Sequence, residues 1–442
     1  MLKGQLLAIG DSLRESLAFP MRVFADLQVH SPYSRATSKN MNLKEVAHFA
    51  SMKGLNVVGT GDFTHPDWRK EVRRDLQEVT DTGLYQLRDG TFQVQCVITG
   101  EVNTTFSFGD KSRRIHHCLL APSIESADAV SDRLAKYGDL SSDGRPTLRA
   151  TAPELVDEVI EADGHCVIFP AHAWTPWFSL FGGISGFDSF IDCYQDRSDR
   201  IFALETGMSS DPPMNWRLSQ LDRLCLVSNS DAHSAWPWRL GREANVFDLD
   251  HVTYHNLVDA IREKDPRRFL FTIETSPTYG KYHWTGHREC QVSMSARDAR
   301  KLDDRCPRCG KKMTRGVEER IEELADRPEG YMPKNAIGYR HLLPLSEIIA
   351  LVIGDVNPGS TKVWDKYNIL VGKFGSEYSV MLDVPEDQLL AAAGPEISRA
   401  ILRVRNDDIY VEPGYDGVYG KLDLHKTAPA KKSATLGLEQ FV

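Results

Sequence analysis

Metal-capable side chains recur at the ends of apolar, β-branched runs in the N-terminal half of the chain. Any one of them could be a hydrogen-bonded core residue, but their joint placement at predicted strand ends indicates a shared site. Imidazole and carboxylate ligands together favour zinc, manganese, magnesium or iron, and a bridging carboxylate allows two or three ions, which would suit phosphoester hydrolysis. The candidates are Asp26, Gln28, His30, Asp62, His65, Glu101, His116, His117, His172, Glu205, Asp231 and His233.

Two of these candidate pairs share a strand face. Residues i and i+2 of a strand point to the same side, so Gln28 lies beside His30 and Asp231 beside His233. Two groups on one face can share a cation. We expect catalysis to depend on seven of the candidates: Asp26, His30, Asp62, Glu101, His172, Asp231 and His233.

The elements that must position these residues alternate along the chain. Strands are predicted near residues 23–30, 55–63, 92–102, 114–120, 165–174, 202–207, 224–233 and 269–275. Helices are predicted at 42–54, 152–164, 215–224, 253–265, 344–354 and 393–404. Repeated strand–helix units predict an α/β fold with a closed or nearly closed barrel, whose site lies at the C-terminal ends of the strands.

A second metal-capable group has the spacing of a structural zinc site. His287 and Cys290 form one ligand pair, and Cys306 and Cys309 follow on a Cys-Pro-Arg-Cys-Gly turn, with His283 as an alternative fourth ligand. We therefore expect one structural zinc ion. The remaining cysteines are isolated in apolar runs and are typical of buried free thiols: Cys96, Cys118, Cys166, Cys193 and Cys225.

Charge is distributed unevenly. The formal net charge of −9 argues mildly against a nucleic-acid partner for the chain as a whole, but residues 281–320 carry eleven Lys or Arg against six Asp or Glu. We expect phosphate contacts from this segment, with a merely solvated basic face as the alternative. The expected contacts are Arg305, Arg308, Lys311, Lys312 and Arg315. Without a run of about 18 apolar residues, we expect no membrane contact and a cytoplasmic, nucleoid-associated protein.

These motifs resemble those of a known family. ADLQVHSPYSRATSKNMNL, GTGDFTHPDW, TGEVNT, PAHAWTPWFSLFGG and SNSDAHS are similar to motifs of the polymerase and histidinol phosphatase (PHP) superfamily. With GHRECQVSMS, CPRCGKKMTRGVEERIEELADRPEGY and PGYDGVYGKL they resemble the endonuclease Q family from about Met21 to Leu424. The resemblance implies a distorted seven-stranded βα barrel with a trinuclear metal site. It also implies a DNA-repair endonuclease that cuts 5′ of deaminated bases (hypoxanthine, xanthine, uracil) or of abasic sites.

The domain organisation follows from the same motifs. We expect an N-terminal extension of unknown role at 1–20, a PHP metallo-phosphoesterase barrel at 21–278 and a zinc-binding, DNA-contacting domain at 279–330. A C-terminal DNA-binding helical or mixed domain at 331–424 and a flexible tail at 425–442 complete the chain.

One position departs from the family pattern. The family's opening motif is Asp-x-His-x-His, and this chain has Gln28 at the first histidine position. The amide can offer a carbonyl oxygen, but it is a poorer ligand than imidazole for zinc-like ions. Reduced occupancy, a changed metal preference and a non-catalytic DNA-lesion binder are therefore alternatives. A small-molecule phosphatase of the PHP superfamily is another, although such an enzyme needs neither the basic insert nor the C-terminal block.

An enzyme that acts beside a damaged base normally extrudes that base into a pocket with flat walls and polar edges. The run that follows His172 offers both, with ordinary loop packing as the alternative. Its candidates are Trp174, Trp177, Ser179, Gly182, Gly183 and Ser185. Tyr33, Ser34 and Arg35 are second candidates for contacting the lesion or its phosphate.

The tail contains an apolar segment after a low-complexity linker. Leu436, Leu438 and Phe441 have the spacing of the short peptide by which bacterial replication and repair proteins bind the sliding clamp, although Thr435 and Gln440 depart from it. A tether of this kind would raise the local concentration on DNA. Residues 435–441 are therefore predicted either to bind the sliding clamp or to be an uninterpreted terminus.

Overall fold

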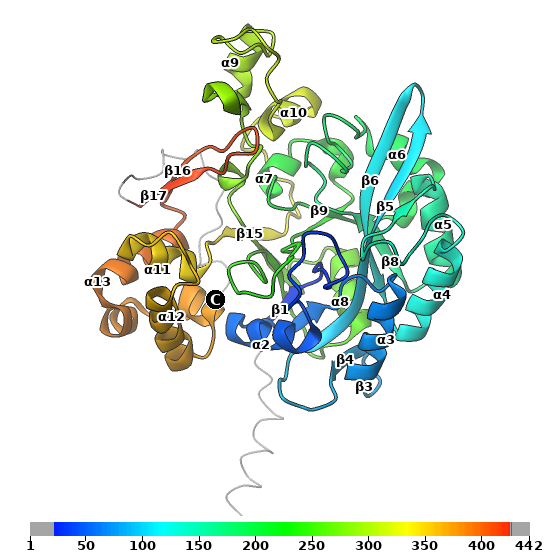
Figure 1. The fold of residues 1–442 in the computed structure, drawn as a ribbon, viewed down its shortest axis with the longest axis horizontal. Helices are drawn as coiled ribbons and strands as arrows, with labels where there is room; N and C mark the ends of the chain where they lie inside the picture. Colours follow the sequence, from blue (N-terminus) through cyan, green and yellow to red (C-terminus); the bar gives the residue numbers. More distant parts are fainter. Residues whose placement is uncertain (1–21, 425, 427–442) are drawn as a thin grey trace, which may run out of the picture.

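The structure, a computed structural model, describes residues 22–424 and residue 426 (Figure 1). The expected N-terminal extension lies outside these residues, as does the clamp-like segment 435–441. A mixed α/β body carries a small insert at the top of Figure 1 and a group of helices at its left. Among the described helices, none is both long and apolar enough for a membrane crossing.

The α/β body is built on an eleven-stranded sheet. Its strands are β1 (Arg22–Asp26), β2 (Val57–Gly59), β3 (Leu76–Val79), β4 (Leu84–Leu87), β5 (Gln95–Phe108), β6 (Lys111–Ala121), β7 (Thr147–Leu148), β8 (Val167–Pro170), β11 (Ala244–Asp248), β12 (Phe269–Glu274) and β15 (Gly338–His341). Their order is β15-β12-β11-β1-β2-β5-β4-β3, with β6 and β7 paired to β5 and β8 paired to β6. All eight predicted runs contain a strand. Five strands of this sheet were not predicted: β3, β4, β7, β11 and β15.

The register of the central strands brings distant residues to one edge. β1, β2 and β5 pair in parallel, with Asp26 opposite Val58 and Val58 opposite Cys96. Parallel neighbours end at the same edge, so the residues just beyond β1 and β2 meet those of β5. β6 runs antiparallel to β5 and places His116 opposite Asn103.

A short parallel pair, β9 (Ala203–Glu205) and β10 (Cys225–Val227), lies beside this sheet. The amide of Ala173, just after β8, donates to the carbonyl of Glu205 at 3.0 Å, and Val29 forms a parallel bridge with Ala232. These contacts tie β9 and β10 to both β8 and β1. The strand pairings among the described residues do not form a closed ring, so the predicted closed barrel is not confirmed.

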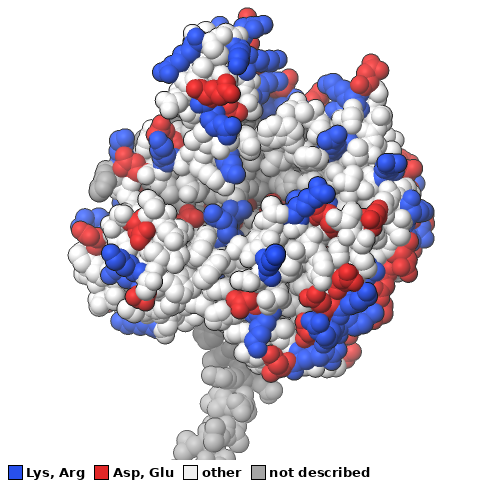
Figure 2. All heavy atoms as spheres, viewed as in Figure 1, with Lys and Arg blue, Asp and Glu red and all other residues white. Residues whose placement is uncertain are grey.

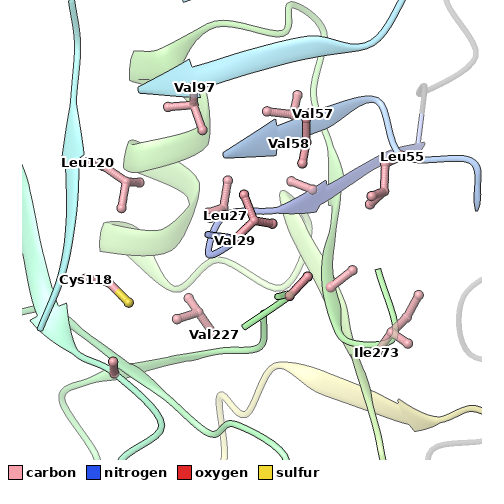
Figure 3. Close-up of a cluster of buried hydrophobic side chains, with 14 of the residues drawn as sticks. Leu27, Val29, Leu55, Val57, Val58, Val97, Cys118, Leu120, Val227 and Ile273 are labelled. Atoms are coloured by element: carbon pink, nitrogen blue, oxygen red, sulfur yellow. The ribbon is translucent and has the colours of Figure 1, made fainter. Parts of the chain in front are cut away.

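Apolar side chains from five of these strands and from the segment after β1 meet in one core. Leu27, Val29, Val58, Val97 and Val227 are buried there, and Figure 3 shows them pointing toward a common centre. Burial of such side chains contributes about 1.5–3 kcal/mol each. The metal-capable residues follow these apolar positions along the chain, so the core fixes where the strand ends lie.

The helices cover the outside of the body and form the left-hand group in Figure 1. They are α2 (Leu43–Lys53), α3 (Pro66–Asp75), α4 (Ile124–Leu134), α5 (Ala152–Ala162), α6 (Phe190–Tyr194), α7 (Pro212–Asn215), α8 (Tyr254–Glu263), α11 (Leu345–Ile353), α12 (Thr361–Phe374) and α13 (Glu386–Arg405). Thr151 and Glu154 form a capping box that starts α5, and Gly54, in the left-handed region, ends α2. Five of the six predicted helices are present.

The sixth, predicted at 215–224, is wrong. The segment holds only the end of α7 and a 3₁₀ turn at Ser219–Leu221. The amide of Ser219 donates to the Asp326 carboxylate at 2.9 Å, and the Asn215 side chain accepts from the Trp174 indole at 2.8 Å. Tertiary hydrogen bonds therefore replace the helical ladder that the amphipathic pattern predicted.

The insert consists of β13 (Thr285–His287), β14 (Val292–Met294), α9 (Ala296–Lys301) and α10 (Val317–Leu324). It contacts the loop between β16 (Tyr410–Glu412) and β17 (Lys421–Asp423), where Asp416 accepts from the Arg288 amide at 2.6 Å and from the Thr314 hydroxyl at 2.7 Å. The α11–α13 group is joined to the body by a buried ion pair between Lys53 and Glu377 at 2.7 Å. Both attachments are thus fixed by polar contacts.

Candidate metal centre

Glu101, His116 and His172 form one metal-capable cluster. Glu101 is in β5, His116 is in β6 and His172 follows β8, and their ligand atoms lie within 4.8 Å of one another. His116 Nδ1 is 2.5 Å from Glu101 Oε1 and 3.2 Å from His172 Nε2. All three side chains are buried. Three strands therefore converge on one point.

His30, Asp231 and His233 form a second cluster, whose ligand atoms also lie within 4.8 Å of one another. His30 Nε2 is 2.8 Å from Asp231 Oδ1, and the rings of His30 and His233 have centroids 4.4 Å apart. Asp231 and His233 were predicted on one strand face, but they lie in the segment after β10 and still meet in one cluster. This cluster is more open, because Asp231 and His233 are only partly buried.

Glu101 connects the two clusters. Its Oε1 lies in the first cluster, and its Oε2 is 3.2 Å from His30 Nε2. Burial alone would raise the pKa of Glu101, but the charges of His116 and Arg145 hold this pKa well below its usual value. The carboxylate therefore remains ionised and can bridge two cations.

Gln28 lies against this bridge. Its Nε2 donates to Glu101 Oε2 at 2.6 Å, while its buried Oε1 has no hydrogen-bond partner among the described residues. An orphaned buried acceptor is unusual and marks a place for a cation or a water molecule. The donor set of four imidazoles, two carboxylates and one amide oxygen fits zinc, manganese or iron.

Asp62 orients His30. Asp62 Oδ1 contacts His30 Nδ1 at 3.0 Å, and Oδ2 accepts from the Ser31 amide at 2.6 Å and the Ser34 hydroxyl at 2.9 Å. Because the Asp62 carboxylate pairs with Nδ1, His30 Nε2 faces the cluster. Histidines that bind metal through one ring nitrogen usually have such a partner on the other. The structure thus places Asp62 beside the clusters rather than within one.

His117 was predicted as a ligand, but the structure places it away from both clusters. Neighbouring residues of a strand point to opposite faces, so His117 turns away from His116. Its ring nitrogens pair with Thr104 Oγ1 at 2.9 Å and Tyr194 Oη at 3.0 Å. Burial lowers the pKa of His117 to about 3, which keeps it neutral.

Glu205 and Asp26 each hold the backbone beside a cluster residue. Glu205 accepts from the His172 amide at 2.7 Å, and Asp26 accepts from the Ser230 amide at 3.0 Å. Burial raises the pKa of Glu205 to about 8. Burial also raises the pKa of Asp26 to about 6, although the hydrogen bonds from Ser230 lower it. His65 is buried but belongs to neither cluster, and its ring stacks on Tyr33 with centroids 4.3 Å apart.

Three residues at the centre have left-handed backbone conformations. Asp62, His172 and Asp231 have φ values of 48°, 28° and 48°. Such values are uncommon outside glycine and cost about 1–3 kcal/mol each, so surrounding contacts must impose them. Two of the three belong to the clusters, where Glu205 and Asp26 supply those contacts.

The proposed base pocket is only partly open. Trp174, Ser179 and Ser185 are buried, and Trp174 stacks on Phe181 with centroids 4.7 Å apart. Gly182 has no room for a Cβ, which would meet the Thr175 carbonyl at 2.5 Å. Ordinary loop packing therefore accounts for these four. Trp177, with 40% of its surface exposed, and Gly183 remain accessible.

The second set of lesion candidates has mixed placement. The Ser34 hydroxyl is buried against Asp62, and the Tyr33 hydroxyl donates to Glu71 at 2.7 Å. Arg35 has a side chain that is 83% exposed and pairs with Asp143 at 3.2 Å. Of the three, Arg35 is the most exposed, and its ion pair with Asp143 would have to open before it reached another partner.

Arg145 was missed by the sequence analysis. It lies in the loop before β7, and its Nη1 is 3.8 Å from Glu101 Oε1. No motif or strand-end position distinguishes this arginine in the sequence. The Asp-Gly-Arg-Pro turn was the only available signal.

The zinc-type group is assembled as predicted. His287, Cys290, Cys306 and Cys309 lie within 4.8 Å of one another, and Cys309 Sγ is 3.7 Å from His287 Nδ1. His283 is not part of this group. One His-Cys pair and one Cys-Cys pair on tight turns, three thiols and one imidazole in all, fit a closed, tetrahedral zinc site.

The predicted phosphate contacts around this group differ in availability. Arg315 is engaged by Glu319 at 3.1 Å and Glu323 at 3.2 Å, so it is not free. Arg305, Arg308, Lys311 and Lys312 are exposed. Figure 2 shows Lys and Arg side chains gathered at the outer end of the insert.

The chain is similar to one protein family and to a curated protein over part of its length. The MJ0043 C-terminal domain family matches residues 344–408. The protein MJ0043 of Methanocaldococcus jannaschii is 33% identical over 258 residues, which are 57% of this chain and 31% of MJ0043. The chain thus spans about a third of the length of this curated relative.

Two solved structures are similar over almost the whole chain. The lesion-specific endonuclease PfuEndoQ from Pyrococcus furiosus gives a TM-score of 0.81 at 35% identity, with 91% of this chain and 95% of that chain covered. A complex of endonuclease Q with a 27-mer duplex that has an abasic lesion at the active site gives 0.80 at 36% identity, covering 91% and 96%.

Proposed function

The chain belongs to the endonuclease Q family, and we propose that it is a metal-dependent DNA endonuclease that cuts 5′ of deaminated bases (hypoxanthine, xanthine or uracil) and of abasic sites. As a member of this family it is a hydrolytic nuclease. The observation that carries the proposal is the pair of metal-capable clusters joined by Glu101 in a chain that covers 95% of a lesion-specific endonuclease.

We further propose the division of labour among the parts of the chain. Residues 21–278 would form a distorted PHP-type barrel, since β9 and β10 are tied to both β8 and β1 by backbone contacts. Residues 279–330 would hold one structural zinc ion and contact DNA. Residues 331–424, which include the MJ0043 C-terminal domain match, would extend the DNA-binding surface.

Two or three divalent ions are the expected cofactors of the barrel. When bound, such ions supply Lewis-acid polarisation of a phosphoryl oxygen and lower the pKa of an attacking water. Glu101 would bridge the two clusters, His116 and His172 would complete one ligand set, and His30, Asp231 and His233 the other. The Gln28 carbonyl oxygen would be a further ligand beside Glu101, at the position where the family pattern has histidine.

Other residues of the chain keep this arrangement ready. Asp62 holds the His30 tautomer that presents Nε2, while Glu205 and Asp26 hold the backbone at His172 and Ser230. Trp177 is exposed in the run that follows His172 and would stack on an extruded base. The exposed cations of the insert would hold the duplex phosphates.

One experiment tests the function. Purified protein is incubated with duplexes that carry one uracil, one hypoxanthine or one abasic site, with an undamaged duplex and with a chromogenic phosphate ester. We expect a nick 5′ of the lesion that chelator abolishes and added metal restores. Hydrolysis of the ester alone would indicate a small-molecule phosphatase, and tight lesion binding without a nick would indicate a non-catalytic binder.

A further inference from the structure

Arg145 stands out as a cation inside an acidic site. Its guanidinium Nη1 lies 3.8 Å from Glu101 Oε1, and the side chain is 21% exposed. The carboxylates of Asp231, Asp62 and Asp143 also act on it. The guanidinium makes no hydrogen bond to any described residue, although it carries five donors. A mostly buried arginine with unused donors at a hydrolytic centre needs a partner.

The loop that carries Arg145 is fixed over the centre. The Gly144 amide donates to the Tyr33 carbonyl at 3.0 Å, and the Pro146 carbonyl accepts from the Asn103 amide at 3.0 Å. Gly144 approaches so closely that a Cβ would lie 2.4 Å from both Asp62 Oδ2 and Ser34 Oγ. The backbone on each side of Arg145 is therefore held by the segments after β1 and β2 and by β5.

The charge balance of the centre indicates what that partner is. Two divalent cations near Glu101 would repel a guanidinium at this distance, unless an anion lay between them. A phosphodiester supplies such an anion, and its negative charge grows on the non-bridging oxygens as water attacks. Arginine suits this role, since its planar fork matches phosphate oxygens and it is always charged.

We propose that Arg145 donates hydrogen bonds to a non-bridging oxygen of the scissile phosphate and is a catalytic residue of this chain. The proposal rests on the proposed endonuclease function. In cleavage, water forms the new P–O bond, the bond to the leaving oxygen breaks, and the leaving oxygen takes up a proton. Arg145 gains and loses no proton in this step but neutralises charge that builds on phosphorus oxygens. The alternative role is a counter-ion that only holds Glu101.

Substitution at Arg145 gives the first test. We expect Arg145→Ala to lower the single-turnover cleavage rate of an abasic duplex by about 10²–10³-fold, as for loss of one transition-state donor. Arg145→Lys should recover part of this rate. Arg149, exposed at the end of β7, is the matched control, and Arg149→Ala should change the rate by less than about twofold. Bound metal and thermal stability should be unchanged in all three variants.

A second test reads binding rather than activity. A duplex with a neutral methylphosphonate at the scissile linkage lacks the charged oxygen. The wild-type enzyme should bind the charged duplex more tightly than the neutral one, and Arg145→Ala should reduce that preference at least about fivefold. An unchanged preference, or loss of bound metal in Arg145→Ala, would overturn the proposal in favour of the counter-ion role. If wild-type protein cuts no lesion duplex, the proposed function fails instead.

Discussion

The two metal-capable regions are built in opposite ways. The four zinc-type ligands come from one segment between His287 and Cys309, held by two tight turns. The two clusters of the α/β body draw their residues from His30 to His233, through β5, β6 and the segments after β1, β8 and β10. One site is local in the sequence, and the other exists only after the sheet has formed.

This difference decides what the rest of the molecule must supply. The insert site needs its own ligands and little else, so a zinc ion bound there would contribute directly to folding of the insert. The two clusters of the α/β body also depend on residues outside them, namely Asp62, Glu205 and Asp26, which hold a ring or the backbone by hydrogen bonds. Their function should therefore be sensitive to residues outside the ligand set.

The neighbours His116 and His117 give the largest expected effect. We predict that His116→Ala lowers lesion cleavage by about 10³-fold or more and removes barrel metal, because it opens the first cluster. His117→Ala should keep activity within about fivefold but lower the free energy of unfolding by about 1–3 kcal/mol, because Thr104 and Tyr194 lose a buried partner.

Cleavage assays, metal analysis and denaturant unfolding check both variants. Equal loss of activity in both would mean that the strand alternation does not separate their roles. Near-normal cleavage by His116→Ala would remove the first cluster from the mechanism.

The two metal-capable regions also differ in how far the sequence predicted them. The zinc group was found complete, because ligand spacing is itself the signal. The candidates in the α/β body were found as residues near strand ends, but the sequence could not say which of two adjacent histidines faces the cluster. Deciding between His116 and His117 requires knowing which face of the β5–β6 hairpin meets His172, which follows β8, and this depends on tertiary packing.

Other omissions have equally physical causes. The helix predicted at 215–224 was lost to tertiary hydrogen bonds from Asp326 and Trp174, which no local pattern reveals. Arg145 lies in an irregular loop and was invisible to a search along strand ends. The α2, α5 and α8 helices were predictable because their caps and apolar spacing are local.

The insert site provides the next prediction. Cys306→Ser should release one tightly held zinc ion and lower the stability of the insert by about 3 kcal/mol, since Cys306 is buried within the ligand group. DNA affinity should fall, while metal in the barrel stays bound. Metal analysis, which counts the zinc that resists a chelator separately, and denaturant unfolding check this prediction. Retention of every zinc ion would reject the site.

A third prediction concerns the joint between the body and the C-terminal helices. His341 of β15 lies 3.1 Å from Asp211 and 3.4 Å from Asp407. Burial alone would lower the pKa of His341, but these two carboxylates raise it to about 9. A pKa above the unfolded value of about 6.5 stabilises the fold fully below pH 6.5, and that contribution is lost as pH rises through 9.

The free energy of unfolding should fall by at most about 3 kcal/mol between pH 6.5 and a pH above 9, because the pKa of His341 rises from 6.5 to about 9 on folding. His341→Gln should flatten this part of the pH profile in urea unfolding. A wild-type profile that is level across this range would contradict a charged His341. The zinc group should contribute in the opposite sense, since its thiolates bind metal more tightly at higher pH.

The smallest expected effect lies at Gln28, where the sequence beside the two clusters departs from the family pattern. Gln28→His replaces the orphaned Oε1 by an imidazole nitrogen, which is a better ligand for zinc-like ions, so we expect about tenfold tighter zinc binding in the barrel. The same change removes the donor to Glu101 Oε2, and Gln28→Met, which lacks both donor and acceptor, isolates that loss. Gln28→Met should therefore weaken metal binding. Competitive metal titration of the three proteins, with the insert zinc in place, measures both effects. Equal affinities throughout would show that neither end of the Gln28 amide serves the metal centre and that this position is a core contact.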